Sequence, residues 1–190
     1  TKNYDTHADV INQLVVPKQG FDNYVVHDEL NDDLVKTHKT LLEKMNQRNS
    51  NNSFFLYLHY SKIHTGIMNE VLKVYDNFSD DFFSNKSKNE LRYDKLFESA
   101  ENYLTKILEK ISQLKFDKNS IILVMSDHGI SVGEKIGERA YGAFCYDYTL
   151  KTFAYLLNSD FQAQEIDTNV RHVDYMPTIL EMLDVETDHS

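Results

Sequence analysis

An apolar run at residues 121–125 passes directly into the polar tetrapeptide Ser126-Asp127-His128-Gly129. An unbroken apolar run of this length is typical of a strand that is covered on both faces of a parallel sheet. A second run, at residues 53–59, is aromatic and nearly as apolar. Segments with the apolar spacing of amphipathic helices lie before, between and after the two runs. Strands that alternate with helices predict an α/β fold, with a mostly parallel sheet flanked by helices.

The spacing of apolar residues predicts an order of elements along the chain. Helices are expected at about residues 28–48, 91–114 and 173–183, and strands at residues 53–59, 121–125 and 152–157. Residues 121–125 are the best candidate for a central parallel strand. The polar residues of the segment 65–89 predict an irregular loop. Pro177 falls in the first turns of the last helix, where proline is tolerated.

Composition limits the size and the partners of the fold. With 190 residues, 41% of them hydrophobic, the chain can build one sizeable core, so we expect residues 1–190 to form a single unit. Thirty acidic residues against 20 basic ones give a net charge of −10, which argues against nucleic acid as a partner. No apolar run is long enough to span a bilayer. The chain starts at Thr1 rather than Met, as a piece of a longer polypeptide would, and the cellular compartment stays open.

Asp127 and His128 are candidate metal ligands. Open α/β sheets bind ligands at the carboxyl ends of their strands, and both side chains follow a predicted strand directly. A carboxylate and a neutral imidazole suit zinc, manganese or a similar divalent ion, and Gly129 lets the backbone turn sharply behind them. In the alternative interpretation, Asp127 caps a following turn and His128 is a partly buried loop histidine.

Two histidines follow the other apolar run. His59 closes it and is expected to be a packed structural residue, whereas His64 falls in the following loop. An imidazole at this edge can hydrogen-bond a substrate oxyanion or protonate a leaving group, because its pKa lies near neutrality. His64 is therefore the candidate catalytic and substrate-binding residue.

Several segments together resemble the sulfatase branch of the alkaline-phosphatase superfamily. These segments are residues 20–24 (GFDNY), residues 53–64 (SFFLYLHYSKIH), Ser126-Asp127-His128-Gly129, Gly133-Glu134 and residues 172–183 (HVDYMPTILEML). The most specific element is the Ser-Asp-His-Gly strand end combined with the downstream helix. The resemblance covers nearly the whole chain. It implies an alkaline-phosphatase-like fold and an enzyme that hydrolyses sulfate or phosphate esters.

The resemblance also implies roles for individual residues. Asp127 and His128 would bind a divalent metal ion, which could be calcium, zinc, manganese or magnesium, and His64 would contact the sulfate or phosphate group. Many relatives place a further side chain facing the anion after the glycine at position 133, for which Lys135, Arg139 and Tyr141 are the candidates here. The expected substrate is an ester of a small molecule or a glycan.

Other residues depart from the family pattern. The family's nucleophile, a Cys or Ser in a Cys/Ser-x-Pro-x-Arg context or a Thr, is absent together with its acidic metal ligands. Cys145 lacks the required Pro and Arg, so we expect it to be a small buried hydrophobic residue. His172 and Asp174 are expected to serve the start of the last helix, with Asp174 as its N-cap. The chain is thus expected to be the carboxyl-terminal part of an incomplete sulfatase-like domain, inactive without an upstream part of the same chain.

Two other interpretations remain open. One is a sulfatase-like module that has lost catalysis and serves as a binding or scaffolding domain. The other is a doubly wound domain unrelated to hydrolases, in which Asp127 and His128 end a strand by chance; it predicts no metal uptake.

Overall fold

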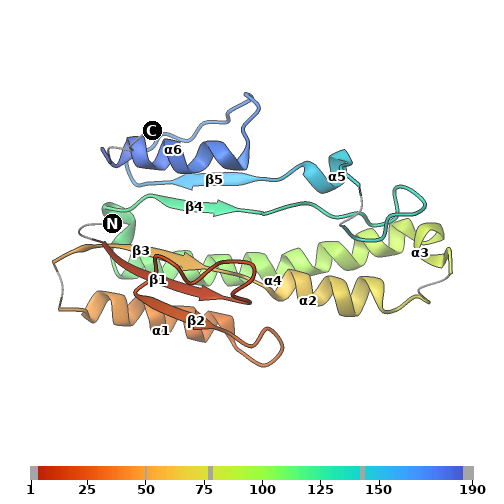
Figure 1. The fold of residues 1–190 in the computed structure, drawn as a ribbon, viewed down its shortest axis with the longest axis horizontal. Coiled ribbons are helices and arrows are strands. Elements are labelled where there is room, and N and C mark those ends of the chain that lie inside the picture. Colours follow the sequence, from red (N-terminus) through yellow and green to blue (C-terminus); the bar gives the residue numbers. More distant parts are fainter. Residues whose placement is uncertain (1–3, 50, 77–78, 142–143, 186–190) are drawn as a thin grey trace. The chain divides into compact units, whose positions relative to one another are not determined.

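The computed structural model describes residues 4–49, 51–76, 79–141 and 144–185. The chain packs into two compact units, the first made of Thr1–Leu114 and Ile130–Phe144, and the second of Lys115–Gly129 and Cys145–Ser190. Each unit has its own sheet and helices (Figure 1). Within the described ranges, every helix is too short or too polar to cross a membrane.

The sheet of the first unit consists of three parallel strands. They are β1 (Tyr4–Val10), β2 (Asn23–Val26) and β3 (Ser53–Leu58), in the order β2-β1-β3. In the register of this sheet, His7 pairs with Asn23 and with Leu56. The strand predicted at residues 53–59 and the parallel sheet are confirmed, and helices accompany the sheet as the α/β prediction requires (Figure 1).

The turn from β1 to β2 is held by Thr6 and Asp22. The backbone N–H of Thr6 donates to Asp22 Oδ2 at 2.9 Å, and the backbone N–H of Asp22 is 2.9 Å from Thr6 Oγ1. Gly20 has a φ of +92°, a left-handed conformation that glycine adopts without strain. The Gly-Phe-Asp segment of the sequence thus starts β2 in register with β1.

Two of the predicted helices lie in the first unit and are confirmed. They are α1 (Leu34–Gln47), whose N-cap Asp33 accepts a hydrogen bond from Lys36 N at 3.1 Å, and α4 (Lys86–Gln113). The two helices pack against each other. Tyr60, just after β3, stacks on Tyr103 of α4 with ring centroids 4.3 Å apart, so the strand end is tied to α4.

The segment predicted to be an irregular loop is largely helical, so that prediction is wrong. It holds the end of α2 (Lys62–Gly66), the π-helix η1 (Ile67–Leu72), α3 (Asp81–Ser84) and the start of α4. The segment forms helices with few apolar residues, because those it has are buried against residues from distant segments. The core cluster consists of Ile67, Val71, Phe82, Leu96, Ile130, Val132 and Ala140.

The second unit is built on a two-stranded antiparallel sheet. Its elements are the 3-10 helix η2 (Phe116–Lys118), β4 (Ile122–Met125), α5 (Asp147–Leu150), β5 (Ala154–Leu157) and α6 (His172–Met182). β4 pairs with β5, Ile122 opposite Leu157 and Met125 opposite Ala154. The prediction that residues 121–125 form a central parallel strand is wrong for this partner. An apolar run indicates a strand but does not set the direction of its neighbour, and antiparallel strands often accompany mostly parallel sheets.

The N-cap of α6 is not the residue that was predicted. Arg171 is the N-cap, and Asp174 stands at the third helical position. The carboxylate of Asp174 accepts a hydrogen bond from Arg171 N at 2.8 Å, and this contact lowers the pKa of Asp174. The prediction of Asp174 as N-cap is therefore wrong, although the residue does serve the start of the helix.

Candidate functional site

Asp127 and His128 lie in the second unit, directly after β4. The backbone N–H of His128 donates to Asp127 Oδ1 at 2.9 Å, and His128 Nε2 lies 3.7 Å from Asp127 Oδ2. The other ring nitrogen, Nδ1, contacts the carbonyl oxygen of Gly129 at 2.7 Å. Because a carbonyl can only accept, Nδ1 carries a hydrogen, and in the neutral ring Nε2 keeps a lone pair on the side of the Asp127 carboxylate.

The pair is accessible, and its geometry fits a cation. The side chain of Asp127 is 75% exposed and that of His128 46% exposed. Two ligand atoms of one zinc ion, each at about 2.0–2.2 Å, stand about 3.3–3.5 Å apart, so the 3.7 Å separation needs only a small adjustment. An oxygen and an imidazole nitrogen can therefore share a divalent ion that keeps positions open towards solvent.

Gly129 is required by close packing of its backbone. Its φ is not positive, but a Cβ at this position would lie 2.2 Å from the carbonyl oxygen of Tyr148. Its N–H donates to Thr149 O at 2.9 Å. The absence of a side chain thus lets the loop that carries Asp127 and His128 lie against α5.

A histidine of α6 supports the same strand end. His172 Nε2 lies 2.9 Å from the carbonyl oxygen of Ser126, the residue before Asp127. On its other side, Ser126 N donates to Phe153 O at 3.2 Å. His172 thus contacts the backbone that leads into Asp127.

His64 lies in α2 of the first unit and meets one of the other candidates. Its side chain is exposed, and Nδ1 is 2.9 Å from the hydroxyl of Tyr141. Tyr141 is thereby distinguished from Lys135 and Arg139 as the residue that contacts the candidate catalytic imidazole. The proximity of His64 to Asp127 stays a prediction.

Lys135 and Arg139 have different surroundings. Lys135 is exposed, whereas the half-buried guanidinium of Arg139 donates to the carbonyl oxygens of Asp76, at 2.9 Å, and Ser79. It also lies over the ring of Phe83, 5.5 Å from the centroid. These contacts give Arg139 a structural role, and substrate binding by either residue stays a prediction.

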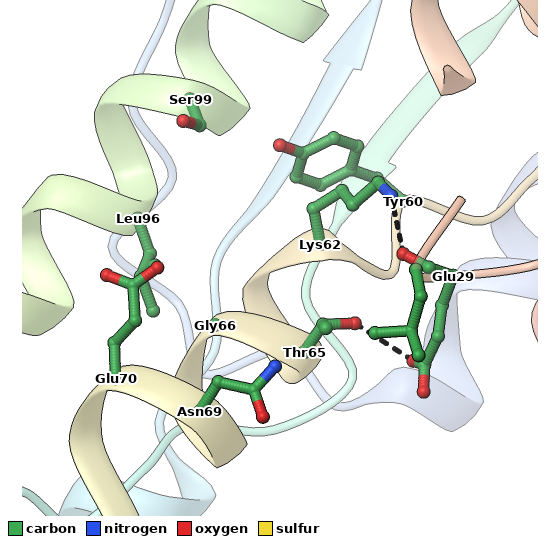
Figure 2. Close-up of a pocket in the computed structure, with 10 residues that line it drawn as sticks. Glu29, Tyr60, Lys62, Thr65, Gly66, Asn69, Glu70, Leu96 and Ser99 are labelled. Atoms are coloured by element: carbon green, nitrogen blue, oxygen red, sulfur yellow. Dashed lines mark hydrogen bonds between the residues drawn. The ribbon is translucent and has the colours of Figure 1, made fainter. Parts of the chain in front are cut away.

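A cleft of about 410 Å³ opens beside the segments that follow β2 and β3 (Figure 2). Glu29 lies at one end of the cleft and binds residues of α2. Its carbonyl oxygen accepts a hydrogen bond from Lys62 Nζ at 2.5 Å, and its carboxylate accepts one from Thr65 Oγ1 at 3.0 Å. Glu70 and Asn69 lie on the opposite side in Figure 2. The cleft is thus lined by both polar and apolar residues, among them residues of α2, the helix that carries His64. Its lining consists of Glu29, Leu30, Tyr60, Lys62, Thr65, Gly66, Asn69, Glu70, Leu96 and Ser99.

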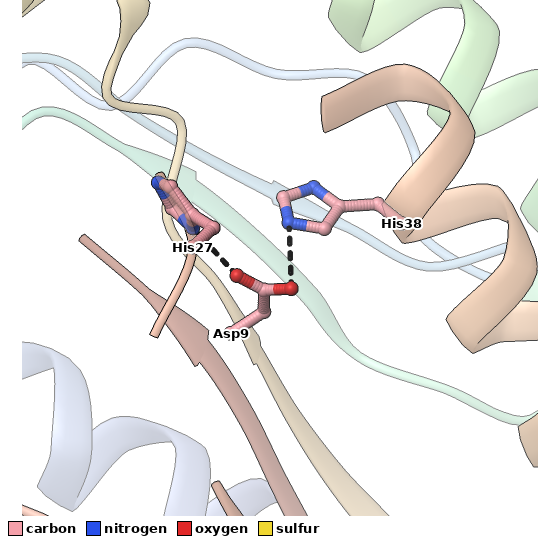
Figure 3. A group of neighbouring side chains, drawn as sticks. All are labelled: Asp9, His27 and His38. Atoms are coloured by element: carbon pink, nitrogen blue, oxygen red, sulfur yellow. Dashed lines mark hydrogen bonds and ion pairs between the residues drawn. The ribbon is translucent and has the colours of Figure 1, made fainter. Parts of the chain in front are cut away.

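Sequence reasoning missed a buried polar cluster in the first unit. The carboxylate of Asp9, on β1, lies between the imidazoles of His27 and His38 (Figure 3). His27 Nδ1 is 2.5 Å from Asp9 Oδ1, and His38 Nε2 is 3.7 Å from Asp9 Oδ2. Asp9 and His27 are 1% and 4% exposed, and His38 is fully buried. A signal was present, because His38 stands four residues from Leu34 and from Leu42 on the apolar stripe of its helix.

The electrostatics of the cluster keep its carboxylate ionised. Burial opposes ionisation of Asp9, but the two neighbouring imidazoles, of which His27 is hydrogen-bonded to the carboxylate, outweigh it, so the pKa of Asp9 is lowered. Tyr103 contacts His38 Nδ1 at 2.7 Å, and its hydroxyl stays protonated because burial and the Asp9 charge raise its pKa. The carboxylate of Asp9 is therefore a buried negative charge between two imidazoles.

Cys145 corrects another prediction. It was expected to be buried, but it is exposed and forms no disulfide. It lies just before α5, outside the cores of both sheets, because the apolar residues that flank it in the sequence do not belong to a strand.

We compared the sequence with models of protein families and with curated proteins. A family model described as Sulfatase matches residues 1–185. The matched range includes His64, Asp127 and His128, and it extends over both units. The search of curated proteins gives no match.

Proposed function

The chain belongs to the sulfatase family, a family of hydrolases, and from this premise we propose that it is part of a metal-dependent enzyme for sulfate or phosphate esters. The proposal rests chiefly on one observation, the exposed pair of donor atoms on Asp127 and His128 at the end of β4. Because the family match extends over both units, we also propose that residues 1–190 belong to one domain, whose remaining parts lie upstream in the same chain.

Asp127 and His128 would hold the metal ion. The lone pair on His128 Nε2 and the carboxylate of Asp127 supply a nitrogen and an oxygen, a set that suits zinc or manganese, while calcium or magnesium would need more oxygen ligands. Further ligands would come from the upstream part of the chain. The bound ion would neutralise charge on the ester oxygens and activate a nucleophile.

His64 would act on the group that leaves. When the Tyr141 hydroxyl donates to Nδ1, the hydrogen of the neutral ring resides on Nε2, which can donate it to the departing alkoxide. The exposed Lys135 can attract the anionic ester. Arg139 would act indirectly, by holding the backbone carbonyls of Asp76 and Ser79. The substrate is proposed to be a small-molecule or glycan ester.

Metal loading of the protein at its natural length tests this function. We expect zinc or manganese to be bound and hydrolysis of an aryl sulfate or an aryl phosphodiester to require it. Asp127→Ala should lower the bound metal by one ion per chain and abolish hydrolysis, whereas Asp147→Ala, which removes an 85% exposed carboxylate of the same unit, should change neither. Metal content that is unaffected by Asp127→Ala would contradict the proposal. Metal that binds through Asp127 without any turnover would instead support the inactive binding or scaffolding module.

A further inference from the structure

We propose that Asp9, His27 and His38 bind a divalent transition-metal ion, for which zinc is the best fit, in a closed site separate from Asp127 and His128. The three residues contribute one oxygen and two imidazole nitrogens, and these ligand atoms all lie within 4.8 Å of one another. Imidazole together with carboxylate is a donor set that zinc binds tetrahedrally.

The cluster stands where a parallel sheet collects ligands. Asp9 is the penultimate residue of β1, and His27 follows the last residue of β2. Both therefore lie at the carboxyl edge of the three-stranded sheet, the edge at which open α/β sheets bind ligands. His38 reaches the same point from α1, as Figure 3 shows.

The unpartnered nitrogen of His38 is the strongest sign of a cation site. Nε2 is buried and has no hydrogen-bond partner among the described residues. It points to Asp9 Oδ2, but the 3.7 Å between them exceeds the usual length of an N–H···O bond. A shared proton would draw the two atoms together. A zinc ion instead keeps its ligand atoms about 3.3–3.5 Å apart, close to the separation observed.

The outer contacts of both imidazoles suit metal ligation. His27 Nε2 lies 2.9 Å from Ser61 Oγ, and His38 Nδ1 lies 2.7 Å from the hydroxyl of Tyr103. Each ring therefore directs one nitrogen towards Asp9 and has a hydroxyl to accept the hydrogen on the other. Metal-bound histidines show this arrangement, because the outer hydrogen bond fixes the tautomer and the ring orientation.

Binding would change one existing contact. His27 Nδ1 and Asp9 Oδ1 are 2.5 Å apart and share a hydrogen, which the ion would displace as a proton. The two atoms would then separate by about 0.8–1.0 Å to reach the spacing of zinc ligands. Small rotations of the Asp9 carboxylate and the His27 ring provide such a shift, so the backbone can stay in place.

A metal here would be structural, since all three side chains are shielded from solvent. A buried water molecule would take the fourth position of the tetrahedron. The metal would join β1, the end of β2 and α1 directly. Through Ser61, which precedes α2, and through Tyr103 of α4, it would also fix the helices on either side. Metal removal should consequently loosen the first unit as a whole.

The test uses the protein at its natural length, with Asp127→Ala and His128→Ala introduced together to eliminate the other candidate site. After treatment with a chelator and reloading with zinc alone, we expect one zinc ion per chain. Adding His38→Gln should abolish binding of this zinc ion. Adding His7→Gln, which changes a histidine outside the cluster on the strand that carries Asp9, should leave it bound. A zinc-free background variant, or zinc retained with His38→Gln, would overturn the proposal.

A spectroscopic measurement covers the case in which His38→Gln does not fold. Cobalt in place of zinc in the folded background variant should give the intense visible absorption of a tetrahedral site, and X-ray absorption should indicate two imidazole ligands. An octahedral cobalt spectrum, or no bound cobalt, would overturn the proposal. Because the background lacks Asp127 and His128, the result is independent of the proposed catalytic function.

Discussion

The hydroxyl of Tyr141 lies 2.9 Å from Nδ1 of His64, although 77 residues separate the two in the sequence. Tyr141 reaches this position because the segment that precedes it belongs to the core of the first unit: Ser131 and Ala140 form a β-bridge, and Asn89 of α4 donates to Val132 O at 2.9 Å. The orientation of an exposed histidine thus depends on a buried framework.

Tyr141→Phe should lower kcat for ester hydrolysis roughly tenfold, a fraction of the roughly 10²–10⁴ that a general acid contributes. The substitution removes the hydroxyl that selects the His64 tautomer and retains the ring. Steady-state kinetics over a range of pH should show the limb that depends on His64 displaced and KM nearly unchanged. Tyr155→Phe, on an exposed tyrosine of β5, is the control. A fall in kcat without a change in the pH profile would argue against tautomer control.

Gly129→Ala should disrupt the proposed metal pair without touching either ligand. The new Cβ would lie 2.2 Å from the carbonyl oxygen of Tyr148, which is backbone and cannot rotate away. We expect a loss of about 1–3 kcal/mol in the free energy of unfolding and weaker metal binding. Chemical denaturation and metal titration measure the two effects.

Gly66→Ala is the matched comparison for that change. Its Cβ would lie 2.3 Å from Cδ2 of Leu96, the end of a flexible side chain that can adopt another rotamer. The stability loss should be smaller than for Gly129→Ala, and metal binding at Asp127 should be unchanged. Equal effects of both substitutions on metal binding would show that close packing at Gly129 does not position the pair.

Acid stability should depend on Asp22. Hydrogen bonds from the backbone N–H and hydroxyl of Thr6 lower the pKa of this carboxyl below its usual value of 3.8. A depressed pKa means that the stabilisation is complete above the unfolded-state pKa and is lost as the pH falls through the folded-state value. The melting temperature of Asp22→Asn should therefore fall below that of the parent at neutral pH, and the difference should shrink below about pH 4.

Glu98→Gln, on the exposed surface of α4, controls for the loss of one negative charge. It should leave the dependence of melting temperature on pH close to that of the parent. If Asp22→Asn and the parent differed by the same amount at acidic and neutral pH, the hydrogen bonds from Thr6 would not account for the effect.

The sequence predicted those elements in which apolar side chains are concentrated in a regular or continuous pattern. The helices α1 and α4 and the strand β3 carry regular or continuous apolar patterns, and all three were predicted. The helices α2, η1 and α3 were not, because Ile67, Val71 and Phe82 are sparse in a polar segment and are buried only by distant partners. Pairing of β4 with β5 was equally hidden, since apolarity does not encode strand direction.

The sites divide in the same way. Asp127 and His128 were identified because they are adjacent in the chain and follow an apolar run. Asp9, His27 and His38 are scattered over 30 residues; Asp9 and His27 look like ordinary polar residues, and only the place of His38 on an apolar stripe marks it out. Only the parallel pairing of β1 with β2, together with the packing of α1, brings them within reach of one another.

Tyr103→Phe should weaken the buried metal site without removing a ligand. The substitution deletes the hydroxyl 2.7 Å from His38 Nδ1, so the imidazole loses the contact that fixes its tautomer, while the ring that stacks on Tyr60 remains. Loss of such an outer contact typically lowers metal affinity about 10–100-fold. Zinc competition against a chromophoric chelator, in the variant lacking Asp127 and His128, measures the change, and Tyr60→Phe controls for altered stacking. An unchanged affinity in Tyr103→Phe would mean that the hydroxyl does not orient His38 for zinc.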